Sequence, residues 1–130
     1  MLPINVNDLL EKNRVESNRI EFKEGWNPVR IYQSICAFAN DIDNLGGGYI
    51  LVGVKEDNGK VVRPVCGLTE EELEDIQKKM IGFNNLIDPY YRPRTSIEPV
   101  DGKNIFVIWA PMGEERPYAV PQDITAKDKK

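Results

Sequence analysis

Apolar and charged residues alternate over residues 19–23, which read Arg-Ile-Glu-Phe-Lys. A period of two is typical of a strand, and here it predicts one that turns Ile20 and Phe22 into a core and its charged residues outward. Residues 49–54 are apolar almost throughout, as in a central strand covered on both faces. The two segments predict two core strands whose acidic ends could converge on one site.

Further stretches have apolar residues at helical spacing. Asn5 or Asn7 can cap a short helix over residues 8–12, because a short polar side chain accepts a hydrogen bond from the first turn. Pro28 suits the first turn of a second helix, which should end before Asn44. Its predicted apolar face consists of Ile31, Ile35, Phe38, Ala39 and Ile42.

A third helix should begin at a capping box, in which the side chains of Thr69 and Glu72 each bond the other's backbone N–H. Three consecutive glutamates in its first turn favour the positive end of the helix dipole. Its predicted buried face consists of Leu73, Ile76, Met80 and Phe83.

Turn sequences complete the expected order of elements. Asn58-Gly59 turns the chain after the strand at 49–54, and Asp101-Gly102 predicts a hairpin of strands at about 95–100 and 104–109. A chain of 130 residues suits a single core. The pattern therefore predicts one α+β domain, with a mixed sheet of about four to six strands packed against about three helices.

Composition excludes several classes of site. The chain has no histidine, so a catalytic triad or a zinc site that needs imidazole is absent. Its two cysteines, Cys36 and Cys66, make no disulfide framework, and no apolar run approaches the roughly 20 residues of a membrane span. Because the N-terminus also lacks a signal-peptide pattern, we expect a cytoplasmic protein that has no membrane partner.

The formal net charge of −4 argues against binding of nucleic acid through overall charge, which normally requires a basic excess. A local basic patch remains as a route if separate segments lie close together. Its members would be Arg19, Lys23, Arg92 and Arg94. The alternative is that these four residues are ordinary solvated surface charges.

Several short motifs occur in a fixed order in the first half of the chain. They are Glu16-Ser17, Glu21-Phe22-Lys23, Ala37-Phe38-Ala39-Asn40, Gly47-Gly48, and Val52-Gly53-Val54 followed by Glu56 and Asp57. With the helix and hairpin behind them, these motifs resemble the Schlafen AlbA-like domain family, also described as a divergent AAA-type DNA-binding domain. The link at residues 41–45 resembles its bacterial branch. Family members usually continue into a Tyr-x-Arg-x-Gly-Ser-Ser segment. We therefore expect a fragment of a longer protein, with residues 110–130 as an extended tail.

The resemblance implies a domain that binds nucleic acid, either DNA or RNA, and for bacterial members the DNA-binding domain of a transcriptional regulator. Animal relatives imply an alternative, a ribonuclease with three acidic residues. Here these would be Glu16, Glu21 and either Glu56 or Asp57, with Mg²⁺ or Mn²⁺ held by Glu16, Glu21 and Glu56. Lys55 stands where the family pattern has an acid, so binding is favoured over catalysis.

Each of these features also has a structural interpretation. Glu21 can pair with Lys23 or Arg19, and the acidic turn can be solvated surface. The glycines at 46–48 can serve a turn rather than a phosphate, since no Gly-Lys-Ser/Thr follows them. The aromatic residues at 90–91 can stack on bases or can simply pack beside proline.

A third interpretation is a protein-interaction module, with a homodimer as the expected form. Schlafen cores look like two AlbA-like lobes set face to face, and this chain carries one. Residues 105–109 are apolar on both faces of a predicted strand, and one of these faces can lack cover in so small a domain. The alternative is a monomer in which the second and third helices cover both faces.

Overall fold

The computed structural model describes residues 5–11 and 19–125, and within them it has three helices and six strands. In chain order the elements are α1 (Val6–Leu10), β1 (Arg19–Lys23), α2 (Pro28–Asn40), β2 (Gly48–Val52), β3 (Glu56–Asp57), β4 (Lys60–Val61), α3 (Glu70–Asn84), β5 (Arg94–Val100) and β6 (Lys103–Ala110).

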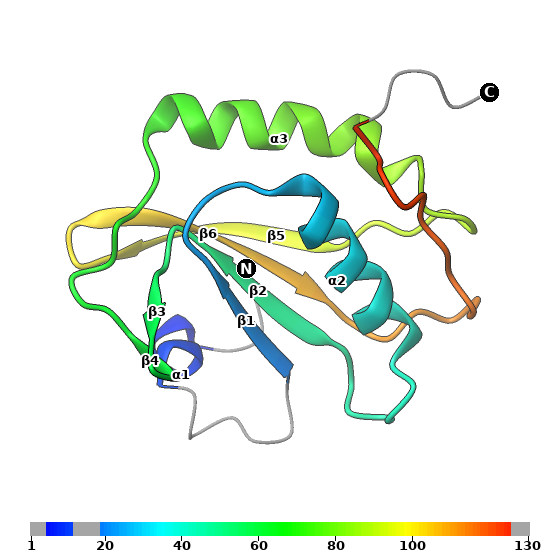
Figure 1. The fold of residues 1–130 in the computed structure, drawn as a ribbon, viewed down its shortest axis with the longest axis horizontal. Helices are drawn as coiled ribbons and strands as arrows, with labels where there is room; N and C mark the ends of the chain where they lie inside the picture. The colour runs from blue at the N-terminus through cyan, green and yellow to red at the C-terminus, as the bar shows by residue number, and fades with distance from the viewer. Residues whose placement is uncertain (1–4, 12–18, 126–130) are drawn as a thin grey trace.

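Four strands form one sheet in the order β1-β2-β6-β5 (Figure 1). β1 runs parallel to β2, whereas β6 is antiparallel to both β2 and β5. β3 and β4 form a separate two-stranded hairpin. The predicted α+β fold, a mixed sheet with three helices, is therefore confirmed. β1 and β5 are the two edge strands, and this placement matters for the site.

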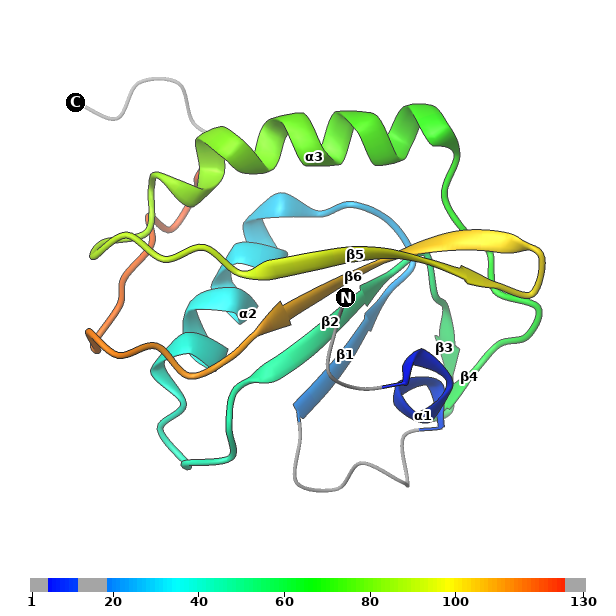
Figure 2. The same ribbon diagram turned by 180° about the vertical axis from the view of Figure 1, so that it is seen from behind.

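Helices lie on both faces of the sheet. Figure 1 shows α2 in front of the strands, and Figure 2 shows α1 on the opposite face. On the α2 side, the sheet residues Ile50, Phe106 and Ile108 belong to a core shared with α2 and α3. On the α1 side, a second core joins α1 to the other face of β2 and β6.

Both faces of β6 are covered. Ile105 and Val107 on the α1 side are 0% exposed, so the expected uncovered face of this strand is wrong. Part of the cover is α1, whose Leu9 and Leu10 pack into the same core. The expectation that the second and third helices cover both faces is also wrong, because α2 and α3 share one face.

Local sequence signals place several element boundaries. β1 covers the alternating segment, and Pro28 is the first residue of α2. The capping box closes with a 2.8 Å bond from the Thr69 N–H to the Glu72 carboxylate and a 3.1 Å bond from the Glu72 N–H to the Thr69 hydroxyl. Asn5 caps α1 by accepting a bond from the Asn7 N–H at 2.7 Å. The predicted core face of α3 is confirmed by Leu73, Ile76, Met80 and Phe83.

α2 departs from its predicted apolar face at the C-terminal end. Asp41 has a φ of 44°, a left-handed conformation that ends the helix at Asn40. Ile42 was expected in the core by its spacing, but it lies beyond the helix and is 88% exposed. Tyr32 and Cys36 occupy core positions on α2 that the sequence pattern did not assign.

The segment after β2 also differs from expectation. β2 ends at Val52, two residues before the predicted end, where Gly53 takes a φ of 99°. Glu56 and Asp57, expected in a solvated turn, are exposed but form β3. The turn itself is Asn58-Gly59, and both of its residues have positive φ.

Residues 111–125 contribute buried side chains to the core although they form neither a helix nor a named strand. Tyr118 and Ile124 are buried in the core shared with α2 and α3. Ala119 forms an isolated antiparallel bridge with Asp88. Among the described helices, none has the length and apolar character needed to cross a lipid bilayer.

Candidate nucleic-acid interface

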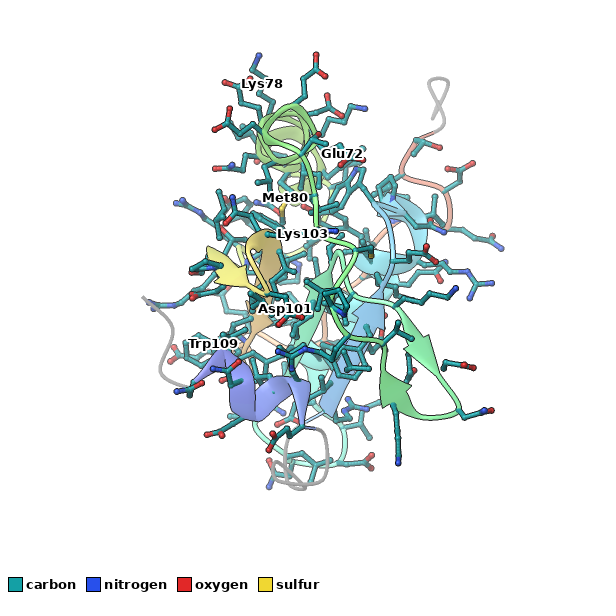
Figure 3. The ribbon with its side chains drawn as sticks, turned by 90° about the vertical axis from the view of Figure 1, so that its left-hand side faces the viewer. Glu72, Lys78, Met80, Asp101, Lys103 and Trp109 are labelled. Atoms are coloured by element: carbon teal, nitrogen blue, oxygen red, sulfur yellow. The ribbon has the colours of Figure 1, made fainter. Side chains whose placement is uncertain are left out.

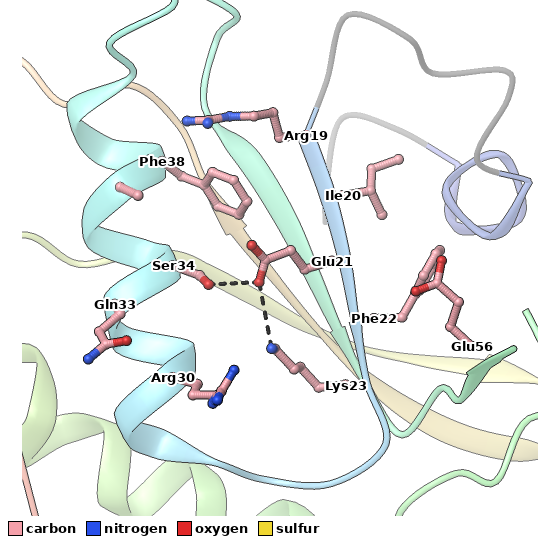
Figure 4. Close-up of a pocket in the computed structure, with 11 residues that line it drawn as sticks. Arg19, Ile20, Glu21, Phe22, Lys23, Arg30, Gln33, Ser34, Phe38 and Glu56 are labelled. Carbon is pink, nitrogen blue, oxygen red and sulfur yellow. Dashed lines mark hydrogen bonds and ion pairs between the residues drawn. The ribbon is translucent and has the colours of Figure 1, made fainter. Parts of the chain in front are cut away.

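A pocket of about 530 Å³ lies between the edge strand β1 and helix α2, and it is called the β1–α2 groove below (Figure 4). Alternation along β1 determines which side chains enter it. Arg19, Glu21 and Lys23 turn toward α2, whereas Ile20 and Phe22 pack on the α1 side. The predicted separation of a charged face from an apolar face of this strand is confirmed.

Three cationic side chains line the β1–α2 groove, namely Arg19, Lys23 and Arg30. The carboxylate of Glu21 lies among them and accepts a hydrogen bond of 2.7 Å from the Ser34 hydroxyl. It also lies 3.9 Å from the ammonium of Lys23, a long contact between partly exposed groups. Ion pairs of this kind are weak, so Lys23 remains able to bind an anion from solution.

Arg19 occupies an unusual position at the end of the groove. Its guanidinium carbon lies 5.0 Å from the centre of the Phe38 ring, a cation–π arrangement. Its Nε is buried and has no hydrogen-bond partner within the described part of the chain. Unpaired buried donors are rare in folded proteins.

Of the acidic residues proposed for catalysis, Glu21 and Glu56 both line the β1–α2 groove. They reach it from different sides, because Glu21 faces α2 while Glu56 lies beside Phe22 (Figure 4). Asp57 is on β3, where it stands in register with Lys60. Glu16 lies outside the described residues. Among residues 5–11 and 19–125, no group of three or more histidine, cysteine, aspartate or glutamate side chains could hold a metal ion.

The four predicted cationic residues lie in separate places on the domain. Arg19 and Lys23 are on β1, and Arg94 is on β5, the opposite edge of the sheet. The Arg94 guanidinium lies 5.7 Å from the centre of the Trp109 ring. Arg92 lines a different pocket, between α3 and β5. One continuous patch of all four residues is therefore not present in a single chain.

The glycine motif shapes the fold beside the groove. A Cβ atom on Gly48 would lie 2.6 Å from the Phe38 ring, so only glycine lets this ring pack on β2. The Asp41 carboxylate accepts hydrogen bonds of 2.8 Å from the N–H groups of Leu45 and Gly46. These amide donors are thus occupied by a side chain of the protein, which supports the turn interpretation of the glycines.

Asp41 is buried, and its pKa reflects two opposing effects. Burial raises the pKa of the carboxyl, but hydrogen bonds from the backbone of Gly46, Leu45 and Gly47, together with the charge of Arg19, outweigh burial and hold the pKa below its ordinary value. The carboxylate therefore stays ionised and keeps the loop before β2 closed.

Three residues of the groove were missed by sequence reasoning, namely Arg30, Gln33 and Ser34. They lie on the polar side of α2, and with Ala37 they follow the spacing i, i+3, i+4 and i+7 of one helix stripe. The stripe was visible in the sequence. Its position beside β1 was not, because that contact depends on how α2 packs on the sheet.

Comparison with known proteins agrees with the fold. The structure resembles the N-terminal domain of a RecG-related protein from Nitrosomonas europaea, with a TM-score of 0.67 and 22% identity over 96% of this chain and 83% of that chain. It also resembles the DIP2311 protein from Corynebacterium diphtheriae, with a TM-score of 0.55 and 16% identity over 85% of this chain. The match spans 25% of the DIP2311 chain. No curated protein sequence matches this chain.

The architecture, a mixed four-stranded sheet with a charged edge strand beside α2, defines a small α+β domain. The sequence model of the Schlafen AlbA_2 family matches residues 16–129, which is most of the chain. The protein belongs to this family, and the resemblance seen in the sequence motifs is confirmed.

Proposed function

We propose that this domain binds nucleic acid through the phosphate backbone, and that it serves as the DNA-binding domain of a bacterial transcriptional regulator. The observation that carries the proposal is the β1–α2 groove, where Arg19, Lys23 and Arg30 gather on a chain whose net charge is −4. Local concentration of cations on an acidic protein marks a surface suited to anions.

Family membership supports the proposal, since a nucleic-acid-related role fits the AlbA_2 family. The name of the Nitrosomonas europaea protein relates it to an ATP-dependent DNA helicase, which also acts on nucleic acid. The chemistry of the groove supplies what such a role needs, because arginine and lysine side chains contact phosphate oxygens without reading base sequence.

The experiment is a binding titration with labelled duplex DNA and labelled transfer RNA at several salt concentrations. Lys23→Ala and Arg30→Ala should weaken binding uniformly across sequences, and each should reduce the salt slope by about 0.9 for every duplex phosphate that the replaced side chain neutralises. Lys78→Ala is the matched control, because Lys78 is exposed on the side of α3 that faces away from the sheet (Figure 3). Equal affinities and slopes for the groove and control variants would overturn the proposal.

The ribonuclease alternative is tested in the same titration by adding Mn²⁺ and following the length of the RNA. Metal-dependent cleavage that is lost in Glu21→Gln would favour catalysis over binding.

Self-association also stays a prediction. Light scattering at micromolar concentrations checks it, and the mass of one chain at every concentration would contradict it.

A further inference from the structure

A second pocket lies at the opposite edge of the sheet from the β1–α2 groove. It is formed between α3 and β5, has a volume of about 450 Å³, and is called the α3–β5 pocket here. Met80 and Phe106 give it an apolar wall, while side-chain amides and an arginine add polar groups. A mixture of apolar walls and a few polar groups is typical of small-molecule sites.

Asn84 is the buried polar residue of this pocket, with an exposed fraction of 7%. Its Oδ1 accepts a hydrogen bond of 2.6 Å from the Tyr32 hydroxyl. Burial raises the pKa of Tyr32 far above its ordinary value, with a smaller contribution from Tyr90, so the hydroxyl keeps the proton that it donates. This bond fixes the orientation of the Asn84 amide. Within the described residues its Nδ2 has no hydrogen-bond partner, so it offers N–H donors to a ligand.

Gln77 lines the same pocket from the preceding turns of α3. Its Nε2 donates a hydrogen bond of 3.1 Å to the Leu73 carbonyl. The amide is thereby oriented, and its Oε1 is left as an acceptor. The pocket therefore presents one oriented donor, from Asn84, and one oriented acceptor, from Gln77.

An aromatic ring and a cation complete the lining. Tyr90 lines the pocket and is 58% exposed, so its ring is accessible for stacking. Arg92 stands two residues further along the chain and also lines the pocket. Aromatic stacking, a donor next to an acceptor and a nearby cation are the groups that bind a base and its phosphate.

We propose that the α3–β5 pocket binds one unpaired nucleotide, with its base stacked on Tyr90, its hydrogen-bonding edge on Asn84 and Gln77, and its phosphate on Arg92. Every nucleobase has a donor adjacent to an acceptor on its pairing edge, so the pocket recognises a base as such. The site is separate from the β1–α2 groove and does not depend on the function proposed for it.

The test is an NMR titration of ¹⁵N-labelled protein with the four ribonucleoside 5′-monophosphates, and with ribose 5-phosphate as the ligand that lacks a base. The side-chain amide signals of Asn84 and Gln77 should shift with the nucleotides and not with ribose 5-phosphate. Tyr90→Ser should weaken binding about tenfold or more, since it removes the stacking ring, and Tyr90→Phe should retain it. Because Tyr90 is exposed, these variants are expected to fold.

Lys23→Ala, in the β1–α2 groove, should leave nucleotide binding unchanged, so failure of one site is distinguishable from failure of the other. Three results would overturn the proposal: no shift of either amide with any nucleotide, equal shifts with ribose 5-phosphate, or equal affinity for Tyr90→Ser and the unchanged protein.

Discussion

The side chain of Asn40 pairs with the backbone of Tyr118, which lies 78 residues further along the chain. Its Oδ1 accepts from the Tyr118 N–H at 2.6 Å, and its Nδ2 donates to the Tyr118 carbonyl at 3.0 Å. The Cys36 thiol donates to the same carbonyl at 3.2 Å. These hydrogen bonds thus hold the C-terminal segment against the end of α2. The Asn of the Ala-Phe-Ala-Asn motif therefore has a structural role in this protein.

Replacement of Asn40 should loosen this attachment. Asn40→Ala removes both bonds and leaves the Tyr118 N–H without its partner, while the Tyr118 carbonyl keeps its bond from the Cys36 thiol. We expect this change to cost about 1–3 kcal/mol of unfolding free energy. Urea denaturation measures the change. Gln33→Ala is the control, because Gln33 is exposed on the same helix. A loss of stability in Asn40→Ala no larger than in the control would contradict the structural role.

Stability should depend on pH through Asp41. Its folded-state pKa lies below the ordinary value of about 4, so its contribution is present above that value and is lost as pH falls through the folded pKa. Asp41→Asn tolerates the left-handed backbone and keeps one acceptor oxygen. At pH 7 we expect it to be less stable by about 1–3 kcal/mol. The difference should shrink below about pH 4, as urea denaturation at each pH would show. A constant difference down to about pH 2.5, well below the ordinary pKa of aspartate, would argue against this role.

Two glycines should respond in opposite directions to alanine. In Gly48→Ala the new Cβ meets the Phe38 ring at 2.6 Å, and overpacking of this kind costs about 1–3 kcal/mol. In Gly82→Ala the Cβ meets nothing within 4 Å and lies inside α3, so helix propensity should add up to about 1 kcal/mol of stability. Melting temperatures of the two variants check the prediction. A shift of the same sign in both would contradict it.

Glu21 offers a way to separate binding from catalysis. Glu21→Gln removes the negative charge beside Lys23 and should strengthen phosphate binding about threefold, in line with the modest energy of exposed ion pairs. Affinity for duplex DNA at low salt measures it. If Glu21 instead held a catalytic metal ion, Glu21→Gln would lose activity and would not gain affinity. Weaker DNA binding in this variant would therefore count against the binding interpretation of the groove.

The sequence by itself determined the features that depend on neighbouring residues. The alternation at Arg19–Lys23, the capping box at Thr69 and the two turns, Asn58-Gly59 and Asp101-Gly102, were all predicted, because a strand face, a helix cap and a tight turn are each specified within a few residues. The family, too, followed from short motifs in a fixed order, and the family match confirms it.

Tertiary structure decided how these pieces meet. Strand order placed β1 and β5 at opposite edges, so Lys23 and Arg94 are apart although both were predicted for one patch. Packing of α2 beside β1 brought Arg30 and Ser34 to Glu21, and a left-handed Asp41 turned Ile42 out of the core. These outcomes depend on contacts between residues far apart in the chain, whose energies are set by packing and burial. A local pattern of apolar and polar residues does not encode them.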